Sequence, residues 1–288
     1  MTWFGLSLAA ALTQATQFAV VKSRAREIPT LVIVAGNQLV AFGAWALFFV
    51  VTGRPFVVPR STWLAIVASA TLVAAMNSLL ARASARGDIS VVGPVFALSP
   101  IFTVLPDAVL SGTLPSPLGW LGLGLATAGT VNLAGGATLV GRLRALFARR
   151  DALDALGAAV ILGAVAAIDR WGAIALGAPT YLVCSHGASA LLSAGIAAAT
   201  LRPAALRTLT PANMLTVLVH GALGMAGTGM QTSALTMAPA AYVNAIRRMS
   251  AVGAVLLGRA MFAEPDVGRR LVAALLASAG AACLLLAR

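Results

Sequence analysis

Apolar runs of about 20 residues, separated by short polar breaks, recur along the whole chain of 288 residues. A helix needs about 20 apolar residues to cross a bilayer, so each run is long enough to span a membrane. Only 10% of the residues are charged, whereas a soluble domain carries about 25%. We therefore expect an all-α polytopic membrane protein. Ten runs predict ten transmembrane helices, at residues 3–21, 30–51, 62–81, 89–110, 117–140, 153–174, 180–200, 211–235, 239–262 and 267–287.

The longest polar stretch lies at the midpoint and divides the ten spans into five and five. An odd number of spans in each half makes the second half enter the membrane from the opposite face, which is an inverted repeat. When one half is shifted by 151 residues, Ser99 falls on Ser250 and Gly129 falls on Gly280. We expect a first repeat at residues 1–141, a basic linker at 142–152 and a second repeat at 153–288.

Most of the 20 Lys and Arg residues lie in short loops, which explains the net charge of +12 without a nucleic-acid partner. Fourteen of them follow odd-numbered spans and four lie on the other side. The positive-inside rule then places both termini outside a bacterial-type inner (cytoplasmic) membrane. The two cysteines fall inside apolar runs and only two histidines exist, so we expect no disulfide, metal or other cofactor.

Two adjacent arginines, Arg247 and Arg248, interrupt the apolar run 239–262. They begin about nine residues into it, or roughly 13 Å along a helix, near the middle of a hydrocarbon core about 30 Å thick. A charge there costs at least about 2.5–3.5 kcal/mol and normally faces protein or a water-filled cavity. Successive side chains point about 100° apart. We expect one arginine to line a central cavity and the other to bond a neighbouring helix, although carbonyls and an acid could satisfy both internally.

Acids that could neutralise this pair are scarce. Six of the eight acids lie on the predicted cytoplasmic side, which leaves Asp107 and Asp169 near the end where the run 239–262 begins. Either could pair with an arginine or act as a gating contact. For Asp169, which stands beside Arg170, a solvated helix end is the favoured interpretation.

Three prolines fall in the single run 89–110. Each removes a backbone donor and frees a carbonyl in the preceding turn, so the run is predicted to be kinked. We expect these kinks to open a cavity or to act as a gate: Pro94, Pro100 and Pro106.

This pattern resembles the drug/metabolite transporter (DMT) superfamily, and within it the ten-helix proteins built from two EamA-type repeats. The stretch Gly87–Val95 resembles the start of that family's fourth helix. The stretch Phe262–Pro265 resembles the turn that ends the ninth, with Ala263 in place of the usual glycine. In the first repeat Thr113 stands where the second has Glu264, a departure from the family's acidic residue.

A narrower stretch, Tyr242–Arg248, is similar to the ninth helix of sugar-phosphate and nucleotide-sugar translocators in the same superfamily. A Lys-Arg pair there contacts the substrate's phosphate, and Arg247 replaces the lysine here. In the family the first, third and eighth helices also line the cavity, so each polar residue below is a candidate for substrate binding or an interhelical bond. The candidates are Arg247, Arg248, Asn244, Tyr242, Asn77, Gln14, His220 and Gln231. His220 could also couple transport to protons.

The favoured function is a secondary transporter that moves a small metabolite with an anionic group by alternating access. The alternatives are a proton-coupled multidrug or amino-acid exporter and, less favoured, an integral membrane enzyme that acts on lipid. The enzyme is disfavoured because the acids are scattered singly. No Gly-x-x-x-x-Gly-Lys loop is present to support drive by ATP. The expected partners are a small-molecule substrate, membrane lipid and protons or an exchange substrate.

Overall fold

The computed structural model describes residues 2–24, 27–86, 95–96, 98–112, 114–132, 150–201, 208–248 and 267–287. This part of the chain is built from α-helices, with one 3-10 turn and no strand among the described residues, so the all-α prediction is confirmed. The elements are α1 (Thr2–Arg24), α2 (Thr30–Thr52), η1 (Arg60–Thr62), α3 (Trp63–Arg86), α5 (Ser99–Ser111), α6 (Pro117–Asn132), α8 (Arg150–Leu176), α9 (Ala178–Thr200), α10 (Pro211–Leu235), α11 (Ala240–Arg248) and α13 (Val267–Leu286).

The described helices follow the predicted apolar runs to within a few residues. The fourth, fifth and ninth runs are covered only in part, because residues 87–94, 133–149 and 249–266 lie outside the described residues. The motif stretch Phe262–Pro265, with Glu264, and most of Gly87–Val95 therefore fall outside them, and so does Thr113.

The surface of the bundle is apolar, as a lipid-facing surface must be. Four described helices are long and apolar enough to cross a membrane, at residues 30–52, 60–80, 150–176 and 178–200. Large apolar side chains stand exposed on several of them; Leu64 and Leu191 are 80% and 79% exposed. Water would oppose such exposure, whereas lipid favours it. The protein is a polytopic membrane protein, as the sequence predicts.

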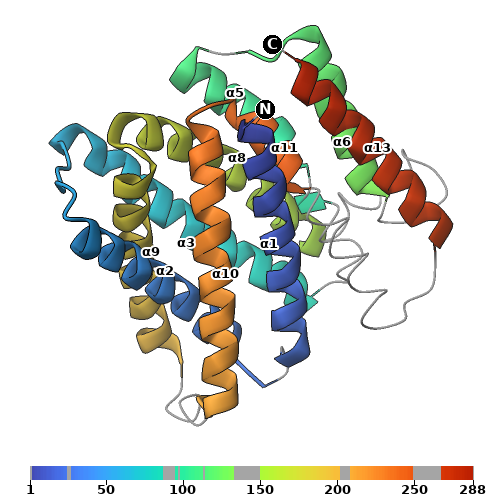
Figure 1. The fold of residues 1–288 in the computed structure, drawn as a ribbon. Helices are drawn as coiled ribbons and strands as arrows, with labels where there is room; N and C mark the ends of the chain where they lie inside the picture. Colours follow the sequence, from blue (N-terminus) through green and yellow to red (C-terminus); the bar gives the residue numbers. More distant parts are fainter. Residues whose placement is uncertain are drawn as a thin grey trace.

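The helices pair in a pattern that two related halves would produce. If the first five helices correspond in order to the last five, the α1–α10 pair has its counterpart in α8–α3, and α2–α10 has its counterpart in α9–α3. The α2–α9, α5–α11 and α6–α13 pairs map onto themselves. Both termini lie at the same end of the bundle (Figure 1). The proposed repeat boundaries themselves stay a prediction.

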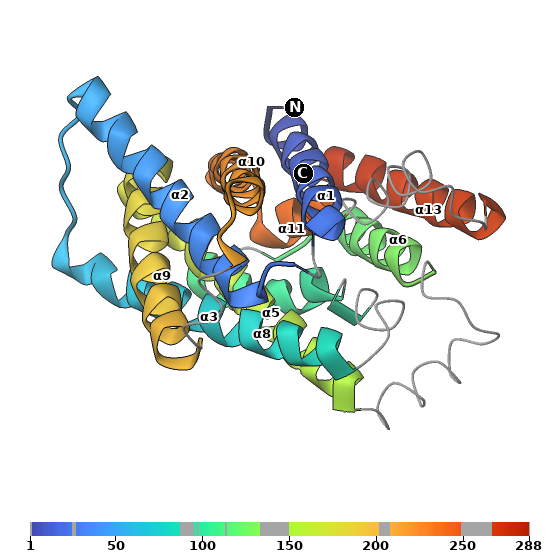
Figure 2. The same cartoon turned by 90° about the horizontal axis from the view of Figure 1, so that it is seen from below.

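Helices α6 and α13 lie side by side at one edge of the bundle (Figures 1 and 2). Their backbones approach closely at two glycines. A Cβ atom on Gly280 would lie 2.4 Å from the backbone nitrogen of Ala126, and one on Gly122 would lie 2.9 Å from the carbonyl oxygen of Gly280. Small residues allow this kind of approach between membrane helices, where packing drives association.

Helices α5 and α8 also meet at backbone contact distance. Pro106 lies inside α5 and cannot donate to the carbonyl of Phe102 one turn earlier. On α8, Gly163 packs against that same carbonyl group, because a Cβ there would lie 2.6 Å from the oxygen of Phe102. The carbonyl that Pro106 leaves without its helical donor thus lies where α8 approaches α5 closely.

Candidate functional site

Helix α11, which carries the arginine pair, lies in the middle of the bundle. It packs against α1, α5, α8 and α10, between the α2–α9 side and the α6–α13 side (Figure 2). Every residue of this helix except Arg247 is buried. Its polar side chains can therefore reach only protein groups or an enclosed polar space.

Arg248 lies against an aromatic ring. Its guanidinium carbon is 5.1 Å from the ring centroid of Phe96, which belongs to the predicted fourth span. The residue is 7% exposed, and its Nε has no hydrogen-bond partner among the described residues. A cation over an aromatic face is held by the ring quadrupole, so Phe96 orients this guanidinium but leaves donors at its edge.

Arg247 is half-buried, and its charge attracts the carboxylate of Asp169 and repels Arg248. Its Nε is buried without a hydrogen-bond partner among the described residues. In that part of the chain neither arginine forms an ion pair; the ion pairs found there join Arg82 to Asp154 and Arg170 to Asp107. Two adjacent guanidinium groups in the bundle centre thus have no direct acidic partner in the described structure.

Asp169 is not a solvated helix end. Helix α8 continues to Leu176, and Oδ1 of Asp169 accepts hydrogen bonds from Oγ of Ser69 at 2.6 Å and from the hydroxyl of Tyr181 at 2.5 Å. Ser69 and Tyr181 are 3% and 1% exposed. The interpretation favoured by the sequence is wrong here, because Ser69 on α3 and Tyr181 on α9 supply the hydrogen bonds that water would have supplied at a solvated helix end.

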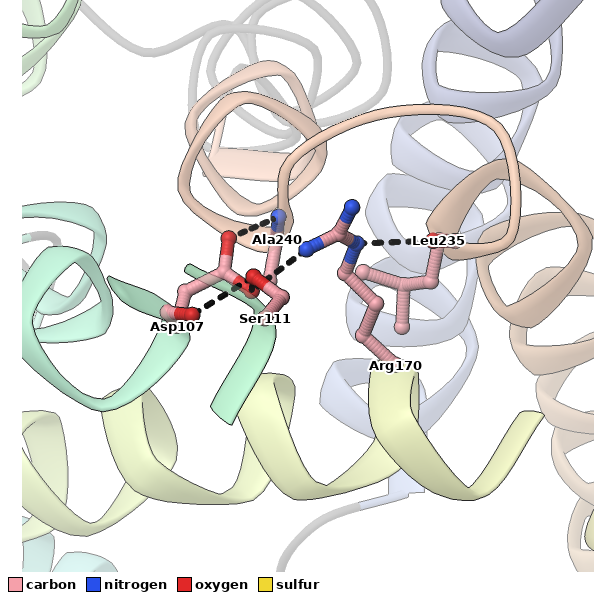
Figure 3. Close-up of polar contacts among 5 residues, drawn as sticks. All are labelled: Asp107, Ser111, Arg170, Leu235 and Ala240. Atoms are coloured by element: carbon pink, nitrogen blue, oxygen red, sulfur yellow. Dashed lines mark hydrogen bonds and ion pairs between the residues drawn. The ribbon is translucent and has the colours of Figure 1, made fainter. Parts of the chain in front are cut away.

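Asp107 forms a buried ion pair with Arg170 (Figure 3). Nη1 of Arg170 donates to Oδ1 of Asp107 at 2.9 Å, and Nε of Arg170 donates to the carbonyl oxygen of Leu235 at 3.3 Å. The second carboxylate oxygen, Oδ2, accepts from the backbone N–H of Ala240 at 2.7 Å. The hydroxyl of Ser111 donates to the backbone carbonyl of Asp107 at 2.6 Å and lies 3.1 Å from Oδ1. Asp107 pairs with an arginine, but with Arg170 rather than with the pair on α11.

Two other predicted site residues on α11 are joined to neighbouring helices. The side-chain amide of Asn244 donates to Oγ1 of Thr103 at 2.9 Å, while its Oδ1 is buried without a partner among the described residues. The hydroxyl of Tyr242 accepts from the backbone N–H of Ser116 at 3.2 Å and fills the space over Gly119. Tyr242 thus joins α11 to the start of α6 and lies in an apolar cluster with Leu123 and Leu284.

The remaining predicted binding residues lie on three other helices. Gln14 on α1 and Asn77 on α3 are half-buried, and Gln231 on α10 is 7% exposed. His220 on α10 has Nδ1 buried with no hydrogen-bond partner among the described residues, while its backbone carbonyl accepts from Nε2 of Gln17 at 2.9 Å. Nothing in these contacts brings the four residues to Arg247.

The three predicted gating prolines have different settings. Pro94 lies outside the described residues. Pro100 is the second residue of α5, where a missing N–H breaks no intrahelical bond. Only Pro106 interrupts the interior of α5.

Sequence reasoning missed three sets of partners. Arg170 was counted as a loop residue, and Ser69 and Tyr181 were not singled out. A buried chain also joins three helices: Nδ1 of His186 is 2.6 Å from Oε1 of Gln38, and Nε2 is 3.1 Å from Oγ1 of Thr228. The signal that the sequence offered for these partners was the presence of single polar residues inside apolar spans. The described residues contain no group of three or more His, Cys, Asp or Glu side chains that could hold a metal.

Comparison with known proteins identifies the type of molecule. Residues 1–134 match the EamA-like transporter family. None of the curated proteins matches the sequence significantly. A solved structure described only as "Crystal structure of protein" superposes with a TM-score of 0.79 over 99% of this chain and 99% of that one, at 19% sequence identity, which shows a shared fold. The EamA-type resemblance is therefore confirmed over the first 134 residues, and this family match implies a membrane transporter of the drug/metabolite transporter type.

Proposed function

We propose that the protein is a secondary transporter that moves a small metabolite with an anionic group by alternating access. The observation that carries the proposal is the pair of guanidinium groups on α11. Arg247 and Arg248 lie in the centre of the bundle, each with a buried Nε that has no partner in the described structure. A substrate anion would complete their hydrogen bonds and balance their charge.

The acids near this site support an external anion rather than an internal one. Asp107 is engaged by Arg170 and by the N–H of Ala240. Asp169 attracts Arg247 electrostatically, but its Oδ1 is bonded to Ser69 and Tyr181 instead. Burying a charge away from water costs free energy unless the charge is paired with an opposite one. Two cations beside a single carboxylate that is bonded to other residues therefore favour the binding of a further negative group.

The two arginines would have different roles in binding the anion. The ring of Phe96 holds the plane of the Arg248 guanidinium, so that its free edge presents a fixed fork of donors. Such a fork matches the geometry of carboxylate and phosphate groups. Arg247, on the side of Asp169, would add a second positive charge next to the bound anion. The match to sugar-phosphate translocators in the stretch Tyr242–Arg248 makes phosphorylated metabolites the first class to test.

An amino-acid exporter is the second candidate, because Asp169 lies within electrostatic reach of Arg247. A substrate with both charges could place its carboxylate on the arginine and its ammonium group toward the acid. For such a substrate Asp169 would contribute directly to binding, whereas for a pure anion it would oppose binding.

The experiment is transport in proteoliposomes together with thermal stability in the presence of ligands. Arg247→Ala and Arg248→Ala should each abolish uptake or efflux of the substrate while the purified protein stays folded. Arg60→Ala is the matched control, because Arg60 is exposed in η1 and the substitution removes the same positive charge. Full activity in both site variants would overturn the proposal.

The ligand panel separates the two candidates. Stabilisation of the wild-type protein by phosphorylated sugars or dicarboxylates supports the anion transporter. Stabilisation by amino acids that is lost in both Arg247→Ala and Asp169→Asn supports the amino-acid exporter. Stabilisation by amines alone would contradict both and favour a multidrug exporter.

A further inference from the structure

The ion pair between Asp107 and Arg170 does more than join α5 to α8. Each of the two side chains also has a second polar atom that hydrogen-bonds a backbone group at one end of the turn between α10 and α11 (Figure 3). Arg170 bonds the carbonyl of Leu235, the last residue of α10, and Asp107 bonds the N–H of Ala240, the first residue of α11. The pair therefore holds both ends of the turn formed by residues 236–239.

The charges also suit the helix ends that they contact. A helix carries partial positive charge at its N-terminus and partial negative charge at its C-terminus. The carboxylate of Asp107 lies at the N-terminus of α11, and the guanidinium of Arg170 lies at the C-terminus of α10. Reversing the two charges would therefore oppose both helix ends and would also leave the N–H of Ala240 without an acceptor.

The helices that carry this ion pair are closely packed and hydrogen-bonded to their neighbours. Helices α5 and α8 touch at backbone distance where Gly163 meets Phe102. The neighbouring residue Asp169 ties α8 to α3 and α9 through Ser69 and Tyr181. The ion pair thus links α10 and α11 to a block formed by α3, α5, α8 and α9.

The contact has no counterpart in the other half of the sequence. With the shift of 151 residues, the positions equivalent to Arg170 and Asp107 hold Ala19 and Gly258, which carry no charge. In an inverted-repeat transporter the two end states exchange the conformations of the halves. A contact present in only one half stabilises only one of those states.

We propose that Asp107 and Arg170 form a one-sided clamp that keeps the end of the bundle near the two termini closed and thereby sets the resting conformation of the transporter. This inference rests on the alternating access of the proposed function. The clamp also positions the arginine pair. Arg247 lies seven residues beyond Ala240, or about 10 Å along α11, so the axial position of Arg247 follows from where Asp107 holds the start of that helix.

The test measures how often this end opens, and it needs no substrate. Val243 is fully buried one turn into α11, in a cluster with Ala166 and Leu235. Val243→Cys is introduced into the full chain with Cys184→Ser and Cys283→Ser, and a charged, membrane-impermeant thiosulfonate is added to reconstituted protein. The rate at which the reagent labels the cysteine introduced at position 243 reports how accessible α11 is from the clamped end.

Arg170→Ala should raise the labelling rate at least tenfold from the side of the termini. The swap Asp107→Arg with Arg170→Asp should remain fast, because it restores the ion pair but not the bonds to Leu235 and Ala240. Recovery of the slow rate by the swap would overturn the clamp and leave an ordinary link between α5 and α8. An unchanged rate in Arg170→Ala would also overturn it.

Two further variants exclude a general loss of stability. Gln38→Leu disturbs the buried contacts of α2 with α9, away from α11, and should leave the labelling rate unchanged. If Arg170→Ala does not fold, Arg170→Lys replaces it in the test. This variant keeps the positive charge but loses the Nε donor to Leu235, so its labelling rate should lie between those of the wild type and a variant without the clamp. A wild-type labelling rate in Arg170→Lys would contradict the clamp. Labelling rates that behave as expected, together with full transport in both Arg247→Ala and Arg248→Ala, would refute the anion site and leave the clamp standing.

Discussion

The hydroxyl of Tyr181 on α9 donates to Oδ1 of Asp169 on α8 at a distance of 2.5 Å. The phenol ring packs on Gly172, where a Cβ atom would collide with it. The glycine, the phenol and the acid form one unit at the α8–α9 contact, and Ser69 extends it to α3. A charged group held in this way depends on each of its donors.

Tyr181→Phe should therefore lower the stability of the bundle by about 1–2 kcal/mol, since hydrogen bonds to charged groups are the stronger ones and interhelical bonds in membranes reach about 1.7 kcal/mol. Tyr242→Phe is the matched control, because its hydroxyl only accepts a neutral N–H at 3.2 Å. It should cost about 0.6 kcal/mol. Denaturant or thermal unfolding of both purified variants gives the comparison. Equal losses would show that the charge of Asp169 adds nothing.

Gly280→Ala should destabilise the contact between α6 and α13. The new methyl group would lie 2.4 Å from the backbone nitrogen of Ala126, which cannot move without shifting the helix. Overpacking of this kind costs about 1–3 kcal/mol. Gly124→Ala on α6 meets nothing within 4 Å and should change stability by no more than about 0.5 kcal/mol. The prediction fails if the two variants melt at the same temperature.

The buried contacts of His186 predict an energetic coupling between α2 and α9. Gln38→Leu leaves one ring nitrogen of His186 without its partner, which costs about 1–3 kcal/mol for a buried group. Adding His186→Leu should return part of that loss, because no polar group is then stranded. A double-mutant cycle should give a coupling energy of about 0.5–3 kcal/mol. Strict additivity of the two single losses would contradict a direct contact.

The predicted orientation has its own measurement. Arg170 lies inside α8 and is bonded to Asp107, so it no longer counts among the loop charges. Fourteen loop charges on one side then face three on the other, which strengthens the placement of both termini outside. Alkaline phosphatase fused to the C-terminus should be active in a bacterial host, while the same enzyme inserted after Arg144 should be inactive. The opposite pattern would invert the proposed topology.

The helices were predictable because each depends on a local quantity. About 20 apolar residues suffice to specify a span, and the bounds of α2 and α10 agree with the predicted runs to within a residue. The buried setting of Asp169 and Arg170 on α8 was less accessible, since the two residues look like a polar helix end unless their partners are known. Asp107 and Ser69 stand 63 and 100 residues away in sequence, and Tyr181 lies on the following helix, α9.

The candidate site was predictable in part for the same reason. Placing two charges in the middle of a membrane span costs free energy, and this cost alone indicates a function. Arg247 and Arg248 could therefore be chosen from the sequence. The side chains that surround them could not. Phe96 and Asp169 come from other spans, and only the packing of helices decides which face of each span they occupy.

The pairing of α6 with α13 has a consequence for how the chain is made. Helix α13 begins about 135 residues after α6 ends. At a synthesis rate of about 5–20 residues per second, α6 enters the bilayer roughly 7–27 s before its main partner exists. The glycines that let the two backbones touch must face lipid during that interval. The close packing at the α6–α13 edge of the bundle therefore forms only after about 135 further residues have been synthesised.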